Sequence, residues 1–273
     1  LQQDKYAVEQ FQLEDWVSKR LKHDNLMQCY PHNTEKKYLF QCYEYLQGET
    51  LAQWLHRQEK PLNLDEILPI LQQTALALNA MHRLEMLHQD IRPKNIMVIN
   101  AENAMKIKLI DYGSTAVRGL VEINPKNANR ALGTLAFMAP EYFIDHSPSV
   151  HSDQFSLAVM AYYLFTKQLP YGTDLARCNS LKQMKKVQYH SIRKYRPDLP
   201  IWLDKILGQA LSIEPIHRFE ALSELIHNLM HPSKELLNSK PPAIIERDPL
   251  RFWQMSCAVL GLLFLLSIAW PFI

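Results

Sequence analysis

The chain has 273 residues, of which 47% are hydrophobic and 21% charged, a balance that excludes a disordered chain and allows one large domain or two small ones. The formal net charge of +2 is too small to indicate a nucleic-acid-binding surface. The four cysteines are far apart and lack metal-ligand spacing, so we expect neither a disulfide framework nor a zinc site.

The first part of the chain alternates helical and strand patterns. Residues 2–26 have apolar side chains at three- and four-residue steps, which predicts an amphipathic helix. The aromatic-rich run Lys36–Leu46 predicts a strand that ends before Gly48. The next patterns predict helices at 50–56 and 64–86 and short strands at 95–99 and 106–110.

Residues 111–140 lack periodicity and contain three glycines and two prolines, which predicts a long ordered loop. Long loops inside compact domains are usually functional. Three further helices are predicted at 153–165, 201–211 and 221–230, followed by a polar linker that contains prolines, at 231–251. Four histidines have no ligand spacing, so we expect surface or capping positions for His82, His146, His151 and His217.

The C-terminal run Phe252–Ile273 contains no charged residue and is long enough to cross a bilayer core of about 30 Å. It predicts a transmembrane helix, with Trp253 and Trp270 near its two ends as aromatic anchors. Basic residues occur only before this run, so we expect a single-pass membrane protein whose preceding residues face the cytoplasm. The alternative is a helix buried in a protein core.

The strongest chemical signal is the segment LHQDIRPKNIMV, residues 87–98. Asp90 and Asn95 lie five residues apart around a proline-containing turn, a spacing that can present a carboxylate and an amide to the same small cavity. Asp111 follows the next predicted strand and precedes Gly113. A carboxylate at a strand end suits magnesium bound to a polyphosphate, because magnesium prefers hard oxygen ligands.

Three segments, HQDIRPKN, DYG and APE, occur in the order and at the spacing of the catalytic-loop, DFG and APE segments of protein kinases. Because of these three segments, the chain resembles a eukaryotic-like serine/threonine protein kinase of the bacterial type. The resemblance implies an α+β, protein-kinase-like fold that is mainly the helical C-lobe. It implies a partial N-lobe at 1–46, with the αC helix and the hinge strand, and a C-lobe at 47–230. A linker at 231–251 and the transmembrane helix at 252–273 follow.

The resemblance also implies roles for the catalytic residues. Asp90 matches the aspartate that orients the substrate hydroxyl and accepts its proton, and Asn95 and Asp111 match the magnesium ligands. Arg92 occupies the usual place of a lysine that contacts the γ-phosphate. Thr134 matches the threonine that bridges the aspartate and the basic residue in serine/threonine-specific members.

A second set of residues matches the nucleotide site. Tyr43 matches the gatekeeper, Glu44 and Leu46 the hinge positions whose backbone meets the adenine edge, and Met97 the adenine floor. Glu14 matches the αC glutamate. The resemblance therefore implies ATP and Mg²⁺ as cofactors and a protein as substrate, with no nucleic-acid partner.

Two further matches have structural roles. Asp153 resembles the aspartate that opens the large central helix and holds the catalytic-loop backbone. Glu141 and Arg218 match the buried ion pair of the family.

The chain departs from the family before Glu14, where neither a GxGxxG loop nor a VAIK-like strand occurs. We therefore expect a piece of a longer chain that is inactive by itself. Gln89 replaces the usual arginine before the catalytic aspartate, which disfavours switching by loop phosphorylation. A membrane-anchored pseudokinase scaffold is the main alternative, and a small-molecule kinase is a third hypothesis.

Overall fold

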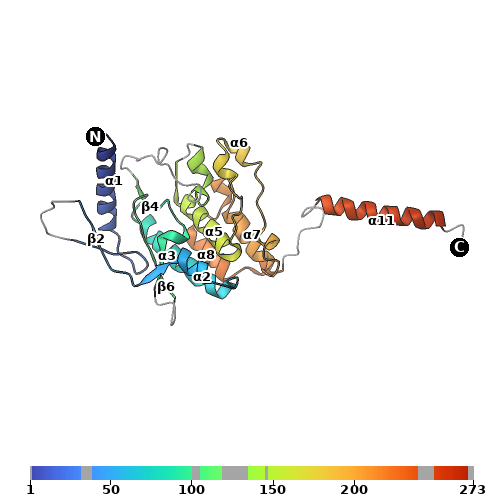
Figure 1. The fold of residues 1–273 in the computed structure, drawn as a ribbon, viewed down its shortest axis with the longest axis horizontal. Helices are drawn as coiled ribbons and strands as arrows, with labels where there is room; N and C mark the ends of the chain where they lie inside the picture. The colour runs from blue at the N-terminus through green and yellow to red at the C-terminus, as the bar shows by residue number, and fades with distance from the viewer. Residues whose placement is uncertain are drawn as a thin grey trace. The chain divides into compact units, whose positions relative to one another are not determined.

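The computed structural model describes residues 2–31, 39–99, 105–118, 135–144, 147–238 and 249–269. Residues 1–233 form one compact unit and residues 234–273 a second. The first unit combines helices with three small sheets, as Figure 1 shows. It contains all the segments that the sequence marks as catalytic, so the α+β expectation holds for the part of the chain that matters for the site.

The strands are short and pair antiparallel in three sheets. In the first sheet β1 pairs with β2, and Cys29 lies opposite Tyr43. In the second, β5 lies between β3 and β6, so the strand that follows the catalytic loop runs beside the strand that precedes Asp111. In the third, β4 pairs with β7. The bounds are β1 Cys29–Tyr30, β2 Cys42–Tyr43, β3 Gly48–Thr50, β4 Met86–Leu87, β5 Ile96–Ile99, β6 Lys106–Leu109 and β7 Ala116–Val117.

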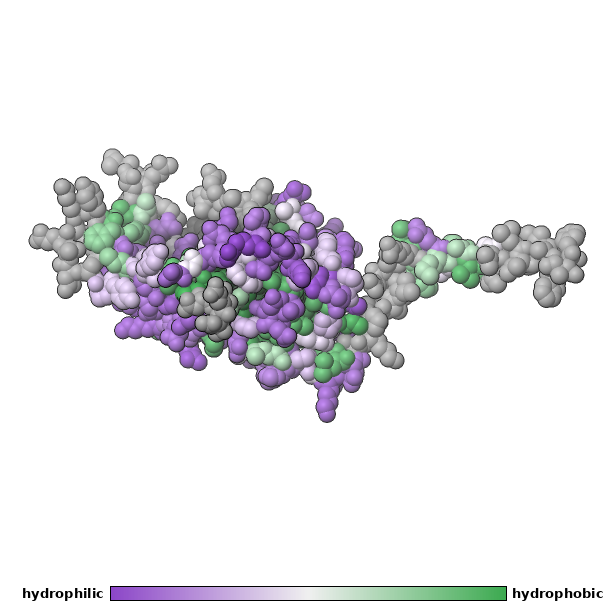
Figure 2. Space-filling view, turned by 60° about the horizontal axis from the view of Figure 1, so that its bottom comes forward, coloured by the Kyte–Doolittle hydropathy of each residue, from purple (hydrophilic) through white to green (hydrophobic). Residues whose placement is uncertain are grey.

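The larger helices of the first unit are α1 Gln2–Ser18, α2 Leu51–Arg57, α3 Leu64–His82, α5 Val150–Thr166, α7 Ile201–Ala210 and α8 Leu222–Met230. Shorter turns complete it: η1 Pro93–Asn95, η3 Pro140–Phe143, η4 Leu175–Arg177, α6 Leu181–Met184, η5 Ile192–Lys194 and η6 Pro215–His217. The helices α3, α5, α7 and α8 pack on one another and form the core. Hydrophilic residues cover most of the face of this unit that Figure 2 shows.

Local sequence explains where the core helices begin. Asn63 opens α3 with a capping box, since its side chain accepts from the Glu66 amide and the Glu66 side chain accepts in return from the Asn63 amide. Ser149 opens α5 in the same way. Nearly every side chain of α5 is buried, so this helix forms the centre of the unit, whereas α8 buries only the leucines of one face.

The predicted helix at 64–86 ends earlier, at His82, because the chain turns at Glu85, which has a φ of 56°, and then pairs as β4. The helix predicted at 2–26 likewise ends at Ser18. The strand predicted over Lys36–Leu46 is confirmed only at Cys42–Tyr43, and residues 32–38 lie outside the described part. Both predicted helices are too long for the same reason. The apolar spacing continues into residues that pair with distant strands instead, Leu26 with Leu109 and Met86–Leu87 with β7.

The second unit contains α9 Lys234–Leu237 and α11 Pro249–Ala269. Helix α11 covers most of the run for which a transmembrane helix is predicted. In the described parts of the chain, no helix reaches the combination of length and apolar character that crossing a membrane requires.

Candidate active site

The catalytic loop connects β4 to β5 and is closed by one side chain. Asn95 donates from Nδ2 to the backbone oxygen of Asp90 and to its Oδ2, both at 2.8 Å. The 3₁₀ turn η1, which begins at Pro93, brings Asn95 back toward Asp90. The structure therefore brings together the carboxylate and the amide that the five-residue spacing predicts, with 11% of the Asp90 side chain exposed.

The N-terminal end of this loop is held by α5. Asp153 is 1% exposed, and its carboxylate accepts from the amide of His88 at 3.0 Å and from that of Gln89 at 2.9 Å. These bonds hold Gln89 at a φ of 66°, an unusual conformation for a residue with a side chain. The loop conformation is thus imposed from the core of the unit.

His82 supplies a third bond to the same carboxylate, from Nε2 to Oδ2 of Asp153 at 2.8 Å. The expectation of a surface or capping position for His82 is wrong, because its side chain is only 10% exposed and joins α3 to α5 beneath the catalytic loop. Sequence spacing could not reveal this contact, since the two residues are 71 positions apart.

His88 is buried beside Asp90. Burial lowers the pKa of His88 and outweighs the nearby carboxylates of Asp153, Asp90 and Asp111, which act to raise it. A neutral ring fits its contacts, because Nδ1 accepts from the amide of Asp90 and Nε2 lies 3.3 Å from the backbone oxygen of Ile110. The ring thus links the catalytic loop to the segment that leads into Asp111.

Arg92 lies against the carboxylate of Asp90, with Nε 3.3 Å from Oδ2. The same oxygen accepts from Asn95, so a cation and an amide both contact it. A guanidinium in this place can neutralise a phosphoryl oxygen that approaches Asp90.

Asp111 lies just past β6, in the left-handed region with a φ of 69°, and its side chain is exposed. Its Oδ1 accepts from the amide of Gly113. The next residue, Tyr112, is buried and donates from its hydroxyl to the backbone oxygen of Met27 at 3.0 Å. The backbone of Asn95 and that of Ile110 are bonded directly, at 2.9 Å, so the two proposed metal-binding segments are neighbours.

This donor set fits magnesium. Asn95 donates through its nitrogen to Asp90, an orientation that leaves the amide oxygen for a cation, and Asp111 adds an exposed carboxylate. Magnesium binds through one or two protein oxygens together with phosphate and water. No cluster of three or more His, Cys, Asp or Glu suited to a metal occurs among the residues described.

Glu14 on α1 faces the same region. Its carboxylate accepts from the hydroxyl of Tyr43 at 3.2 Å, and its Oε2 would lie 3.5 Å from a Cβ placed on Gly113. Burial raises the pKa of Glu14, the Tyr43 hydrogen bond opposes this, and the charge of Asp111 adds to it. The carboxylate therefore lies beside Asp111 at a place where a cation would stabilise it.

The predicted hinge residue Glu44 contacts the residue before β1 and a side chain of β6. The amide of Glu44 donates to the backbone oxygen of Gln28, and its carboxylate contacts Lys108, so only the backbone oxygen of Glu44 is left for an adenine edge. Leu46 makes no backbone hydrogen bond to another described residue. Met97, for which the resemblance implies the adenine floor, lies in β5 between Thr50 and Lys108.

The APE segment is anchored by a buried ion pair. Arg218 donates to both oxygens of Glu141 at 2.9 Å, and the hydroxyl of Ser152 adds a bond of 2.7 Å. Side-chain exposure is 0% for Arg218 and 3% for Glu141. Thr134, the remaining predicted site residue, lies outside the described residues.

The chain is similar to known protein kinases. The protein kinase domain family matches residues 2–232. Serine/threonine-protein kinase PrkC of Bacillus subtilis is 25% identical over 222 residues, which are 81% of this chain and 33% of that protein. Serine/threonine-protein kinase pkn3 of Myxococcus xanthus is 30% identical over 221 residues, 79% of this chain and 40% of that protein.

Among solved structures, the PknI kinase domain of Mycobacterium tuberculosis shares the fold, with a TM-score of 0.62 at 24% identity, over 82% of this chain and 79% of that one. The chain belongs to the protein kinase domain family. The predicted kinase fold is confirmed, and so is the predicted enzyme class at the level of the family and its named serine/threonine relatives. The chain spans only about a third of the length of the first of these curated relatives.

Proposed function

We propose that this chain supplies the catalytic segments of a serine/threonine protein kinase, which transfers the γ-phosphoryl group of ATP to a hydroxyl of a protein substrate. The observation that supports this best is the closed catalytic loop, in which Asn95 positions Asp90 and Asp153 holds the backbone that precedes it. A loop built in this way orients a carboxylate toward an incoming hydroxyl without further rearrangement.

The proposed roles follow from the contacts. Asp90 orients the substrate hydroxyl and accepts its proton, while Arg92 balances charge on the transferred group. Asn95 and Asp111 would hold Mg²⁺ through their oxygens. When bound, the ion neutralises the phosphate oxygens of ATP. Met97 and the backbone of Leu46 would contact the adenine.

The direct test is the substitution Asp90→Asn in the full-length protein, which keeps the size of the side chain and removes its basicity. We expect the rate of phosphotransfer from ATP to a peptide substrate to fall by about 10²- to 10⁴-fold. The matched control is Asp24→Asn, because Asp24 is exposed in the loop after α1, and we expect its rate to equal that of the wild type. An unchanged rate in Asp90→Asn would disprove the proposal.

The expectation that residues 1–273 are inactive by themselves stays a prediction, and the same assay on this chain tests it. We do not favour the pseudokinase scaffold, because a scaffold has no chemical need for a carboxylate held by an amide next to a cation. Attachment to a membrane by the uncharged run Phe252–Ile273, with the kinase domain on the cytoplasmic side, is a further part of the proposal that depends on sequence alone.

A further inference from the structure

A basic segment follows the APE region. Residues 175–196 contain basic side chains and neither Asp nor Glu, and the basic residues are Arg177, Lys182, Lys185, Lys186, Arg193, Lys194 and Arg196. The structure separates them by their partners. Arg196 is paired with Asp198 at 2.7 Å and Arg177 with Asp174 at 3.8 Å, so both are neutralised by carboxylates from the flanks of the segment.

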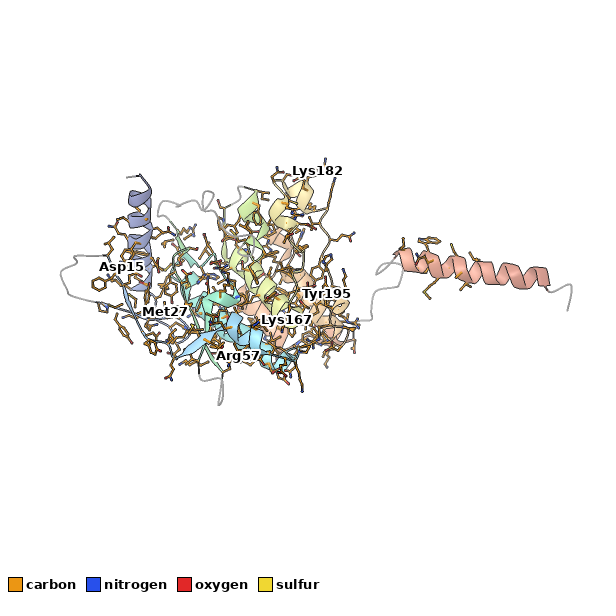
Figure 3. The ribbon with its side chains drawn as sticks, in the orientation of Figure 1. Asp15, Met27, Arg57, Lys167, Lys182 and Tyr195 are labelled. Carbon is orange, nitrogen blue, oxygen red and sulfur yellow. The ribbon has the colours of Figure 1, made fainter. Side chains whose placement is uncertain are left out.

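The lysines of α6 form one face. Helix α6 ends at Met184, and the chain turns directly after it, where the amide of Lys185 donates to Leu181 and that of Lys186 to Gln183. Lys185 and Lys186 therefore follow Lys182 by three and four positions within one tight turn, the spacing of neighbours on one surface. All three are exposed, and Figure 3 shows Lys182 on the outside of the domain at α6.

Only one of these lysines has an acidic partner. Lys185 contacts Glu214 at 2.7 Å, whereas no carboxylate of the described residues lies within ion-pair distance of Lys182 or Lys186. Two neighbouring ammonium groups on a short helix repel each other. Their positions are therefore suited to a partner that brings negative charge.

An exposed apolar side chain lies two residues after the acidic partner of Lys185. The Lys185–Glu214 pair places η6 next to α6, and Ile216 in η6 is 85% exposed. We call Lys182, Lys185, Lys186 and Ile216 the α6 face. The turn before it, η4, packs on η3, which contains Glu141 of the APE segment, so the α6 face follows directly on a segment that contacts the active-site region.

We propose that the α6 face binds an acidic segment of the protein substrate that also presents an apolar side chain. This inference rests on the proposed kinase function and identifies the chemical class of the substrate. Charge complementarity accelerates association and fixes the register of a bound chain, while the isoleucine adds contact area that a purely acidic chain would not use.

An anionic lipid surface is the competing partner, and the charge favours it less. Lipid recognition of this kind uses clusters of about four to eight lysines or arginines. The α6 face offers one exposed isoleucine and two lysines that have no carboxylate partner among the described residues. This is enough for a peptide that meets it at defined points and too little for stable adsorption to a membrane.

The test measures binding separately from catalysis. Two fluorescent peptides share one core, in which alanine replaces the phosphoacceptor. The acidic peptide has a tail of Asp, Glu and Leu, and the neutral peptide has a tail of Gln and Leu. We expect the full-length protein to bind the acidic peptide more tightly by fluorescence anisotropy. The double variant Lys182→Glu/Lys186→Glu should weaken this binding about tenfold at low salt, and the weakening should shrink as salt is added.

The matched control is Lys60→Glu, an exposed lysine between α2 and α3, which should retain the preference for the acidic tail. Ile216→Ser should weaken binding of both peptides. Equal affinity for the two tails, or no effect of the double variant, would overturn the proposal. A third outcome would also overturn the proposal. If the double variant bound peptide normally but lost the preference for phosphatidylserine-containing over phosphatidylcholine vesicles, the α6 face would bind lipid.

A kinase assay separates failure of the α6 face from failure of the proposed kinase function. With serine restored in the core, the ratio of KM for the neutral tail to KM for the acidic tail should fall in the double variant. If neither peptide is phosphorylated while the charge-dependent binding persists, the kinase function fails and the binding surface stands.

Discussion

At the scale of single residues, Tyr112 shows how this chain accommodates a change from the family pattern. The position usually holds phenylalanine in the DFG segment, and a tyrosine there buries a hydroxyl. The hydroxyl donates to the backbone oxygen of Met27 and, at 3.3 Å, lies near that of Leu109. Burial raises the pKa of Tyr112, so the group stays protonated and remains a donor at any physiological pH.

We expect Tyr112→Phe to lower the free energy of unfolding by about 1 kcal/mol, because it leaves the oxygen of Met27 without its side-chain donor. Urea unfolding followed by circular dichroism measures the change. Tyr45→Phe is the matched control, since Tyr45 is 91% exposed and its substitution should have no measurable effect. An equal stability of wild type and Tyr112→Phe would show that the Met27 contact contributes nothing.

At the scale of elements, Arg218 connects η3, α5 and the loop before η6. Besides the two bonds to Glu141, its guanidinium donates to the backbone oxygens of His151, Ser212 and Ile213, so all five of its N–H groups have acceptors. Burial alone would raise the pKa of Glu141, but the hydrogen bonds and charge of Arg218, with the hydroxyl of Ser152, together lower it.

We expect Arg218→Met to lower the free energy of unfolding by about 3–5 kcal/mol, since it leaves the Glu141 carboxylate buried without a partner. The double variant Glu141→Gln/Arg218→Met should recover part of that loss. Arg57→Met is the control, because the Arg57–Glu49 pair is exposed and its loss should cost less than about 1 kcal/mol. Similar costs for Arg218→Met and Arg57→Met would contradict a buried, cooperative pair.

The same ion pair predicts a pH dependence. The pKa of Glu141 is lower in the folded chain than its ordinary value of 4.5. Its contribution is therefore fully present above about pH 4.5 and is lost as the pH falls through the lower folded pKa. Unfolding measured on either side of that value should show a steeper acid loss of stability in the wild type than in the double variant. Parallel curves would exclude Glu141 as a source of the slope.

At the scale of the whole molecule, the chain consists of a kinase unit and a C-terminal unit that contains α11. The described parts of the chain contain no helix that meets the requirements for crossing a membrane. The proposed anchor depends on the uncharged run of the sequence, so only an experiment on the full-length protein decides it.

We expect the full-length protein to remain with membranes after a carbonate wash, and a variant that ends before Phe252 to appear in the soluble fraction, because the run supplies the apolar surface. Protease added outside intact spheroplasts should leave the kinase unit uncut. Recovery of the two proteins in the same fraction would rule out this run as the anchor.

The sequence by itself determined the family and the order of the core helices, because short motifs and helical periodicity are local properties. The trio Asp90, Asn95 and Asp111 stays a prediction from the same motifs. The tertiary structure decided which groups meet. Three findings depend on segments distant in the chain. His82 donates to Asp153, the Glu44 amide is occupied by its hydrogen bond to Gln28, and α3 ends earlier than its apolar pattern predicts. The α6 face is the same case. Its charge is visible in the sequence, but only the structure shows that Lys182 and Lys186 have no carboxylate partner among the described residues and that Ile216 is exposed.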